Sequence, residues 1–264
     1  MVRVRKPYVI AEEGDHQVVW LGLEEAELER GVLTNQYLVV DSGEGLLIDP
    51  GGSYVFERVY RNVREFVNPN RVKAVFFTHQ DPDVVGSLVM LSEFFPNARI
   101  YISSLWVRFL PHLGIHGGIE IVEVPDEGGE VPVGKAKLLA IPTHFLHSPG
   151  NHTLYDPVTK TLFSGDLGAA VFPRGVWYLF VEDFDKHSQY MKPFHERYLP
   201  CREALEAWLS IVSDLEIEVV APQHGAIFVG ENAIKFLEWL KKLNKFGIDR
   251  VKEVVERWKS KRVF

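Results

Sequence analysis

The sequence predicts an α/β protein in which two β-sheets pack face to face with helices on the outside. Short apolar runs and amphipathic segments alternate along the chain, and this alternation is repeated in two halves. Apolar residues make up 46% of the 264 positions, enough to bury a large core without disulfides. No repeat, linker-like stretch or low-complexity tract divides the chain. Residues 1–264 are therefore expected to form a single domain.

The first half of the chain reads as strands joined by turns. Apolar and β-branched runs between Gly, Asp and Asn predict strands at Gln17–Leu21, Asn35–Val40, Gly45–Ile48 and Ala74–Thr78. Helical spacing predicts helices at Glu57–Phe66 and Val84–Phe95. Asp81 at the N-cap and Pro82 at the first helical position are a good start signal for the second of these helices. The polar run 79–83 is therefore expected at a strand-to-helix turn.

The second half repeats this organisation. Strands are expected at Arg99–Ser103, Lys137–Ile141 and Glu218–Ala221, with a hairpin formed by Thr153–Tyr155 and Thr161–Phe163. Helices are expected at 185–212 and Asn232–Leu243. The basic residues between Lys245 and Arg262 alternate with apolar ones at helical spacing, which indicates a solvated helix face rather than an RNA or membrane patch.

Composition excludes several classes of partner. The net charge of −7 argues against broad nucleic-acid binding, which needs clustered Lys and Arg. No apolar run approaches the roughly 20 residues that span a bilayer. The charged segment Met1–Lys6 lacks the apolar stretch of a signal peptide. A cytoplasmic protein without a membrane partner is therefore expected. The single cysteine, Cys201, excludes an internal disulfide and a zinc site made of cysteines alone.

Four short segments each place a metal-binding type of residue at the end of an apolar, strand-like run. They are Phe77–Asp83, Thr143–Gly150, Leu162–Asp166 and Val220–Gly225. Imidazole and carboxylate groups hold divalent metals, and rigid strand ends fix their geometry. The sequence therefore predicts a metal site at which these four segments meet.

The order of these residues resembles the metal-binding pattern of the metallo-β-lactamase superfamily: His-x-acid-x-Asp at 79–83, His147, Ser-Gly-Asp at 164–166 and His-Gly at 224–225. Asn-Gln-Tyr-Leu-Val at 35–39 and Leu-Leu-Ile-Asp-Pro-Gly at 46–51 fit this family as well. The resemblance covers nearly the whole chain. It implies an αββα sandwich, in which two mixed β-sheets pack face to face with helices outside.

Within the superfamily, the chain is more similar to flavodiiron proteins and to oxygen-binding diiron proteins that lack the flavodoxin domain. Asp81 stands where most hydrolases of this fold have a second histidine, and eighteen positions separate His147 from Asp166. The stretch 183–194 also resembles the segment that precedes the last strand in that family. The resemblance implies one metal held by His79, Asp81 and His147, a second held by Asp83 and His224, and Asp166 bridging the two.

The donor set favours iron. The six candidates are three histidines and three aspartates, and hard carboxylate oxygens favour iron or manganese, whereas affinity alone would favour zinc. Two iron ions are therefore expected, with zinc as the alternative. Many relatives carry a histidine directly after the Asp of the first motif, but this chain has Val84. The second metal would then have three protein ligands and either an open position or weak binding.

The other histidines have less specific surroundings. His144 and His152 flank His147 closely, so one of them could donate to a ligand or replace the missing one. No motif surrounds His112, His116, His187 or His195, which are expected to be surface residues or to support the ligands.

Two classes of function fit this site. The first is a diiron protein that binds dioxygen, or reduces dioxygen or NO. The sequence has no glycine-rich phosphate loop for a flavin, so reduction would need a separate flavoprotein donor. A homodimer is expected, and the donor could be reached across it. Binding and sensing are slightly favoured. The second class is a zinc-dependent hydrolase of esters, amides or phosphodiesters, in which Asp166 is the catalytic residue that positions the metal pair. Asp81 and Val84 depart from the hydrolase pattern.

Overall fold

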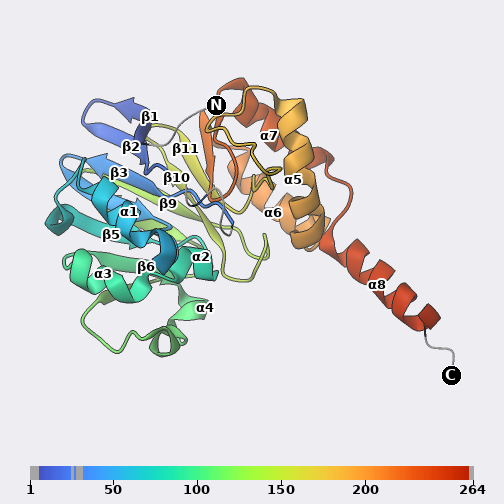
Figure 1. Cartoon of the computed structure of the whole chain (residues 1–264), viewed down its shortest axis with the longest axis horizontal. Helices are drawn as coiled ribbons and strands as arrows, with labels where there is room; N and C mark the ends of the chain where they lie inside the picture. The colour runs from blue at the N-terminus through green and yellow to red at the C-terminus, as the bar shows by residue number, and fades with distance from the viewer. Residues whose placement is uncertain (1–5, 25–26, 28–31, 262–264) are drawn as a thin grey trace.

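Two β-sheets form the centre of the protein, as the sequence predicts (Figure 1). The computed structural model describes residues 6–24, 27 and 32–261. Met1–Arg5 and Arg262, which belong to charged segments considered above, lie outside the described residues. No helix in the described part of the chain is long and apolar enough to cross a bilayer.

The first sheet has seven strands in sequence order, and its first four strands are antiparallel while β4 to β7 are parallel. They are β1 (Tyr8–Glu13), β2 (His16–Trp20), β3 (Tyr37–Asp41), β4 (Glu44–Ile48), β5 (Val72–Phe76), β6 (Arg99–Ser103) and β7 (Glu120–Val124).

The second sheet has six strands in the order β13-β12-β11-β10-β9-β8, and only β11 and β12 run parallel to each other. They are β8 (Gly129–Val133), β9 (Ala136–Pro142), β10 (His152–Asp156), β11 (Thr161–Gly165), β12 (Val219–Pro222) and β13 (Phe228–Val229). Both sheets are therefore mixed.

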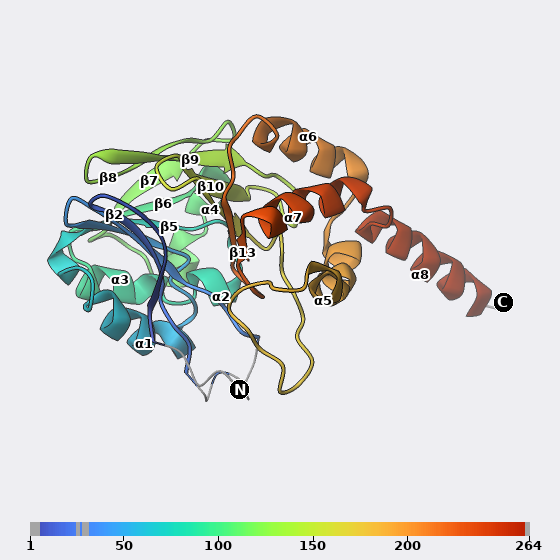
Figure 2. The ribbon, with the colours of Figure 1, turned by 90° about the horizontal axis from the view of Figure 1, so that it is seen from above.

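Helices cover the outer faces of the two sheets (Figures 1 and 2). The first sheet carries α1 (Ser53–Val63), α2 (Pro82–Val85), α3 (Leu88–Phe94) and α4 (Ser104–Val107), with short 3-10 turns at Pro69–Arg71 and Leu110–Leu113. The second sheet carries α5 (Phe184–Tyr198), α6 (Arg202–Val212) and α7 (Glu231–Lys242), and α8 (Gly247–Lys261) follows.

The buried apolar residues form three clusters that match these layers. One cluster, with Val39, Phe76 and Phe163, fills the space between the two sheets. Each of the other two lies between one sheet and its helices, around Phe56 and Trp208 respectively. Strands whose two faces are both covered read as continuous apolar runs, which is why β4, β5 and β11 could be recognised from the sequence.

Two expected helices are each split in two. The helix expected at Val84–Phe95 breaks at Gly86 and Ser87, because the N–H and hydroxyl of Ser87 both bind the carbonyl of Gly51, at 3.2 and 2.7 Å. The helix expected at 185–212 breaks at Leu199, whose extended backbone (φ −71°, ψ 126°) suits a residue that precedes a proline.

His16 links the two sheets at their ends opposite those at which the segments of the predicted metal site lie. Its Nδ1 lies 3.0 Å from Asp41 of β3, and its Nε2 lies 2.8 Å from Asp156 of β10. All three side chains are buried. Burial disfavours the charged imidazole, but hydrogen bonds to both carboxylates outweigh this effect and raise the pKa of His16.

Candidate metal centre

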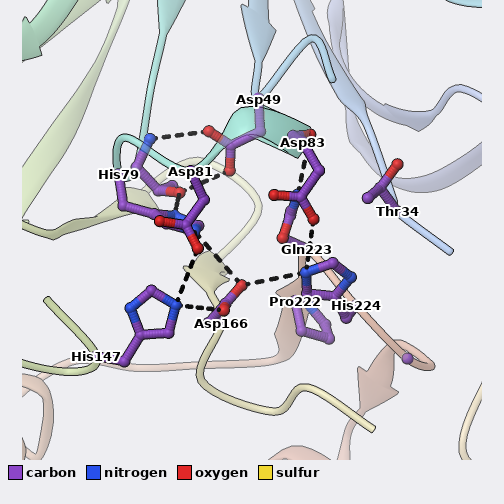
Figure 3. A network of polar contacts seen from close by, with 12 residues as sticks. Thr34, Asp49, His79, Asp81, Asp83, His147, Asp166, Pro222, Gln223 and His224 are labelled. Atoms are coloured by element: carbon purple, nitrogen blue, oxygen red, sulfur yellow. Dashed lines mark hydrogen bonds and ion pairs between the residues drawn. The ribbon is translucent and has the colours of Figure 1, made fainter. Parts of the chain in front are cut away.

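Six side chains that are far apart in the sequence converge where strands of both sheets end (Figure 3). His79, Asp81 and Asp83 follow β5 and enter α2, while His147 lies in the loop between β9 and β10. Asp166 follows β11, and His224 follows β12. Since β11 and β12 are parallel neighbours, their carboxyl ends deliver these last two residues to the same edge. These are the six residues predicted from the sequence.

Asp166 lies at the centre of the cluster and faces all three histidines. Its Oδ2 is 2.9 Å from Nε2 of His147. Its Oδ1 is 3.7 Å from Nε2 of His79 and 3.5 Å from Nε2 of His224. One carboxylate therefore offers its two oxygens to different neighbours.

The other two aspartates lie on opposite sides of Asp166 (Figure 3). Oδ2 of Asp81 is 3.4 Å from Nε2 of His147 and 4.0 Å from Nε2 of His79, and donor atoms of these three residues lie within 4.8 Å of one another. On the other side, Oδ2 of Asp83 is 3.3 Å from Nε2 of His224. The donors thus form two groups that share Asp166.

The cluster fits divalent cations. Among the described residues, Nε2 of His79 and Oδ1 of Asp166 are buried and have no hydrogen-bond partner. Leaving a buried polar atom unpaired costs about 1–3 kcal/mol, so native proteins rarely do so without a ligand or ion. Both atoms point into the space that the six donors surround (Figure 3). A metal ion placed there would accept a lone pair from each.

The electrostatics of the cluster also favour positive charge. Burial opposes the charged form of His147, but hydrogen bonds to Asp166 and Asp81 raise its pKa to about 10. Burial is likewise outweighed at His224, where the charges of Asp166 and Asp83 raise the pKa to about 9. Asp166 is buried, yet the surrounding histidines hold its pKa far below the ordinary value. Without a metal, protons on the histidines supply the positive charge that the carboxylates require.

Two hydrogen bonds orient ring nitrogens toward the centre. Nδ1 of His79 lies 2.9 Å from the Thr78 hydroxyl, which itself donates to Asp49 at 2.8 Å. Since this hydroxyl proton is used by Asp49, Nδ1 of His79 donates to Thr78 and leaves Nε2 free as a metal ligand. Nδ1 of His224 donates in the same way to the carbonyl of Leu33 at 2.7 Å, which again leaves Nε2 free.

Asp49 is a supporting residue that the residue-by-residue sequence analysis did not assign to the site. It is buried and also accepts the N–H of Thr78 at 2.8 Å. Burial, partly offset by the charge of His79, raises its pKa to about 6. The Asp-Pro-Gly turn at 49–51 was noted as a motif, and an aspartate at the end of a buried strand was the signal for this role.

His195 supports the turn that follows Asp166. Its Nε2 accepts a hydrogen bond from the N–H of Gly168 at 3.0 Å, while its Nδ1 donates to the carbonyl of Met191 at 2.9 Å. The ring is fully buried against Trp239, and burial lowers its pKa to about 4, so the ring is neutral. Of the two alternatives expected for His195, a position on the surface is therefore wrong. It is also wrong for His187, which is buried and binds the Tyr178 hydroxyl at 2.8 Å.

His144 and His152 do not join the cluster. Nε2 of His144 lies 2.8 Å from the carbonyl of Asp126, and Nε2 of His152 lies 3.0 Å from that of Pro125. The N–H of Gly150 also donates to Nδ1 of His144. The two rings thus fasten the loop that carries His147 to the neighbouring 125–126 loop, and neither replaces the missing ligand.

Val84 is fully buried in the apolar cluster under the first sheet. It occupies the position at which a histidine would have followed Asp83, and it offers no donor atom. Among the described residues, the group beside Asp83 therefore contains only Asp83, His224 and the shared Asp166.

Aromatic side chains of α5 border the other group. The rings of Phe194 and Tyr198 lie 6.1 and 5.8 Å from the ring of His147, and the two rings stack on each other. Tyr198 and Phe145 are 52% and 54% exposed, so this edge of the site is an apolar rim open to solvent.

Comparison with known proteins places the chain in a family. The model of the ODP family beta lactamase matches residues 32–225. A solved structure described as a peroxy diiron species of the chemotaxis sensor ODP is 39% identical, superposes with a TM-score of 0.82, and is matched over 94% of this chain and 99% of that one. The apo state of the chemotaxis sensor ODP from T. denticola gives the same identity and TM-score, over 95% and 99% of the two chains.

The similarity to curated relatives covers only part of their length. The flavo-diiron protein FprA2 of Clostridium acetobutylicum is 24% identical over 213 residues, which are 78% of this chain and 52% of that protein. The chain thus spans about half the length of the curated relatives that it matches first. The family model covers most of the chain and agrees with the 39% identical structures, so this protein belongs to the ODP family of beta-lactamase-fold domains.

Proposed function

We propose that this protein holds two iron ions and binds dioxygen. The position of Asp166 between two groups of donors is the observation that carries the proposal, because a carboxylate with an oxygen directed to each side can bridge two metals. Three carboxylates among six donors favour iron relative to a histidine-rich zinc site. The related chemotaxis sensor ODP has been described as a diiron protein, which supports this choice.

The residues of each group have distinct tasks in this proposal. His79, Asp81 and His147 would hold the first iron, Asp83 and His224 would hold the second, and Asp166 would be shared between them. When bound there, a pair of ferrous ions would supply the electrons that a diatomic ligand such as O₂ or NO accepts. Thr78 and Leu33 orient the imidazoles of His79 and His224, and His195 fixes the turn after Asp166.

Val84 leaves the second iron with fewer protein ligands and therefore with room for a small molecule. An apolar side chain at this position cannot coordinate the metal or donate a proton. Because position 84 supplies neither a ligand nor a proton, we favour binding and sensing over repeated reduction. Reduction of O₂ or NO in turn would require electrons from a separate flavoprotein, which is the second form of the same proposal.

Metal analysis and O₂ binding test the proposal together. Protein prepared without oxygen from iron-rich cultures should contain close to two irons per chain, and its reduced form should take up O₂ with a change in visible absorbance. The Asp166→Ala variant should lose both the bound iron and the uptake of O₂. Protein that contains only zinc and hydrolyses esters or phosphodiesters would contradict the proposal and identify a hydrolase. Steady consumption of O₂ when a reduced flavoprotein is added would favour the reductase form over the sensor.

A further inference from the structure

Gln223 places a buried amide against the candidate metal centre, where histidines and carboxylates are the other polar groups. It directly precedes His224 in the chain, and the residue is only 1% exposed. Its Nε2 donates to the main-chain carbonyl of Asp83 at 3.2 Å. Figure 3 shows this amide beside Asp83 and next to His224. The side chain therefore borders the group of donors formed by Asp83, His224 and the shared Asp166.

The oxygen of this amide is buried without a partner. Within the residues that the structure describes, five buried side-chain atoms have no hydrogen-bond partner, and Oε1 of Gln223 is one of them. Two of the others are Nε2 of His79 and Oδ1 of Asp166, which face the centre of the cluster. Buried acceptors are rarely left unpaired in native proteins. A cation at the centre is a partner that these three atoms could share.

Hydrogen bonds fix both the amide and the backbone of Gln223. A carbonyl only accepts hydrogen bonds, so the amide must turn its NH₂ group to the carbonyl of Asp83, and Oε1 is the atom left for another partner. The N–H of Gln223 donates to the carbonyl of Gly165 at 2.7 Å, and its own carbonyl accepts the N–H of Asn35 at 2.6 Å. A donor held in this way is placed before a metal arrives.

The chemistry of an amide oxygen suits the position that Val84 leaves without a donor. The side chain of Val84 is packed in the apolar core and cannot coordinate a metal. Cations that prefer carboxylates also accept carbonyl oxygens, including those of Asn and Gln side chains. An amide is neutral, so it adds a ligand without adding to the negative charge of the three carboxylates. It is also a weak donor, which a small molecule can displace or join.

We propose that Oε1 of Gln223 is a further ligand of the second metal, in place of the histidine that many relatives carry after the Asp of the first motif. This inference rests on the proposed function, because it requires a metal beside Asp83 and His224. The competing explanation is structural: Gln223 would act only through Nε2, by holding the backbone of Asp83. The two explanations assign the effect to different atoms of one amide, so variants can separate them.

Titration of metal-free protein with Fe²⁺ in the absence of oxygen, against a competing chelator, measures the affinity of each binding step. Wild-type protein should bind two ions per chain. Gln223→Leu should leave the first step unchanged and weaken the second by roughly tenfold or more. Gln223→Asn keeps an amide that is one methylene shorter, and it should weaken the second step as well. Gln189→Leu, at an exposed glutamine of α5, is the matched control. Equal melting temperatures of the metal-free proteins would show that the variants fold.

Gln223→Glu and a spectroscopic probe separate the ligand from the structural role. Gln223→Glu keeps an oxygen at this position but loses the NH₂ group that binds Asp83, so it should bind the second ion at least as tightly as wild type. If only Nε2 mattered, this variant would be as weak as Gln223→Leu. Co²⁺ reports the ligand set through its visible absorbance. The spectrum of the second equivalent should differ between wild type and Gln223→Leu, because one ligand is lost.

The outcomes distinguish this inference from the proposed function. If wild type binds two ions and Gln223→Leu binds the second with the same affinity or the same Co²⁺ spectrum, the ligand role of Gln223 is wrong and the two-metal site stands. A Gln223→Glu protein as weak as Gln223→Leu also overturns the ligand role, because Nε2 is then the atom that matters. Wild-type protein that binds fewer than two ions per chain overturns this inference and the proposed function together.

Discussion

His195 holds the turn that follows Asp166: Nε2 of His195 accepts a hydrogen bond from the N–H of Gly168, two residues after this central carboxylate of the cluster. The ring has no freedom to turn, since Nδ1 is bound to the carbonyl of Met191 four residues earlier in the same helix. A neutral histidine outside the cluster thereby fixes the backbone next to Asp166, the proposed bridging ligand.

Replacing His195 should weaken metal binding without removing a ligand. His195→Leu leaves the N–H of Gly168 unpaired, and loss of such a supporting contact costs roughly 10- to 100-fold in metal affinity. His195→Gln retains a hydrogen-bond acceptor and should recover most of the lost metal affinity. Competition with a chelator measures both. His112→Leu, at an exposed histidine, is the matched control. Equal affinities for all four proteins would exclude this positioning role.

His147→Ala should empty the first metal position and leave the fold intact. The variant loses one of the three donors that this side has besides the shared Asp166, while the core clusters do not depend on this ring. We expect about one metal per chain, with wild-type secondary structure by circular dichroism. Phe145→Ala, at an exposed position two residues earlier, should keep the wild-type content. Unchanged metal content in His147→Ala would mean that the ligand assignment is wrong.

Metal loading should release protons at neutral pH. In the metal-free protein the pKa of His147 is raised to about 10 and that of His224 to about 9, so both imidazoles are in the charged, doubly protonated form at pH 7. Coordination requires neutral imidazole, so up to two protons per chain should leave when both metals bind. Affinity should therefore rise with pH until these values are passed. Calorimetry in buffers of different ionisation enthalpy counts the protons, and a heat independent of buffer would contradict the mechanism.

His16, which lies at the end of the sheets opposite the metal cluster, should make the free energy of unfolding depend on pH. Its pKa is raised in the folded state by hydrogen bonds to Asp156 and Asp41, which outweigh burial. The stabilisation is therefore complete below the unfolded value of about 6.5 and is lost as pH rises through the folded pKa. His16→Gln should lower the free energy of unfolding by about 3 kcal/mol at pH 6, because it leaves two buried carboxylates without a cation.

Denaturation with urea at several pH values measures this difference. The gap between wild type and His16→Gln should be largest near pH 6 and should narrow at alkaline pH. His116→Gln, at an exposed histidine, should behave as wild type throughout. A gap that widens with pH would show that His16 is neutral in the folded protein.

The sequence was sufficient to predict the two-sheet architecture and the strands that are buried on both faces, such as β4, β5 and β11. It did not predict strands β1, β7 and β8 at the edges of the sheets, in each of which two residues at most are buried. The helix breaks at Gly86 and Leu199 depend on a long-range hydrogen bond and on a proline, and only the proline was visible in the sequence.

The six clustered residues could be identified because each stands at the end of an apolar run in a recognisable order. The supporting residues could not, because their roles depend on contacts between distant segments. His195 reaches Gly168 across 27 positions, and His224 reaches the carbonyl of Leu33 across 191. A backbone carbonyl also has no signature in a sequence. The sequence shows that Val84 stands where many relatives have a histidine. Only the structure shows that this side chain is packed in the apolar core.

Helix α5 contacts the candidate metal centre, and the residues that follow it contact the start of α8. His195 of this helix holds the turn after Asp166, and the ring of Tyr198 lies beside His147. The two residues that follow the helix, 199 and 200, accept hydrogen bonds from the first turn of α8. A substitution that bends or breaks α5 would therefore disturb the turn after Asp166, the surroundings of His147 and the position of α8 at the same time.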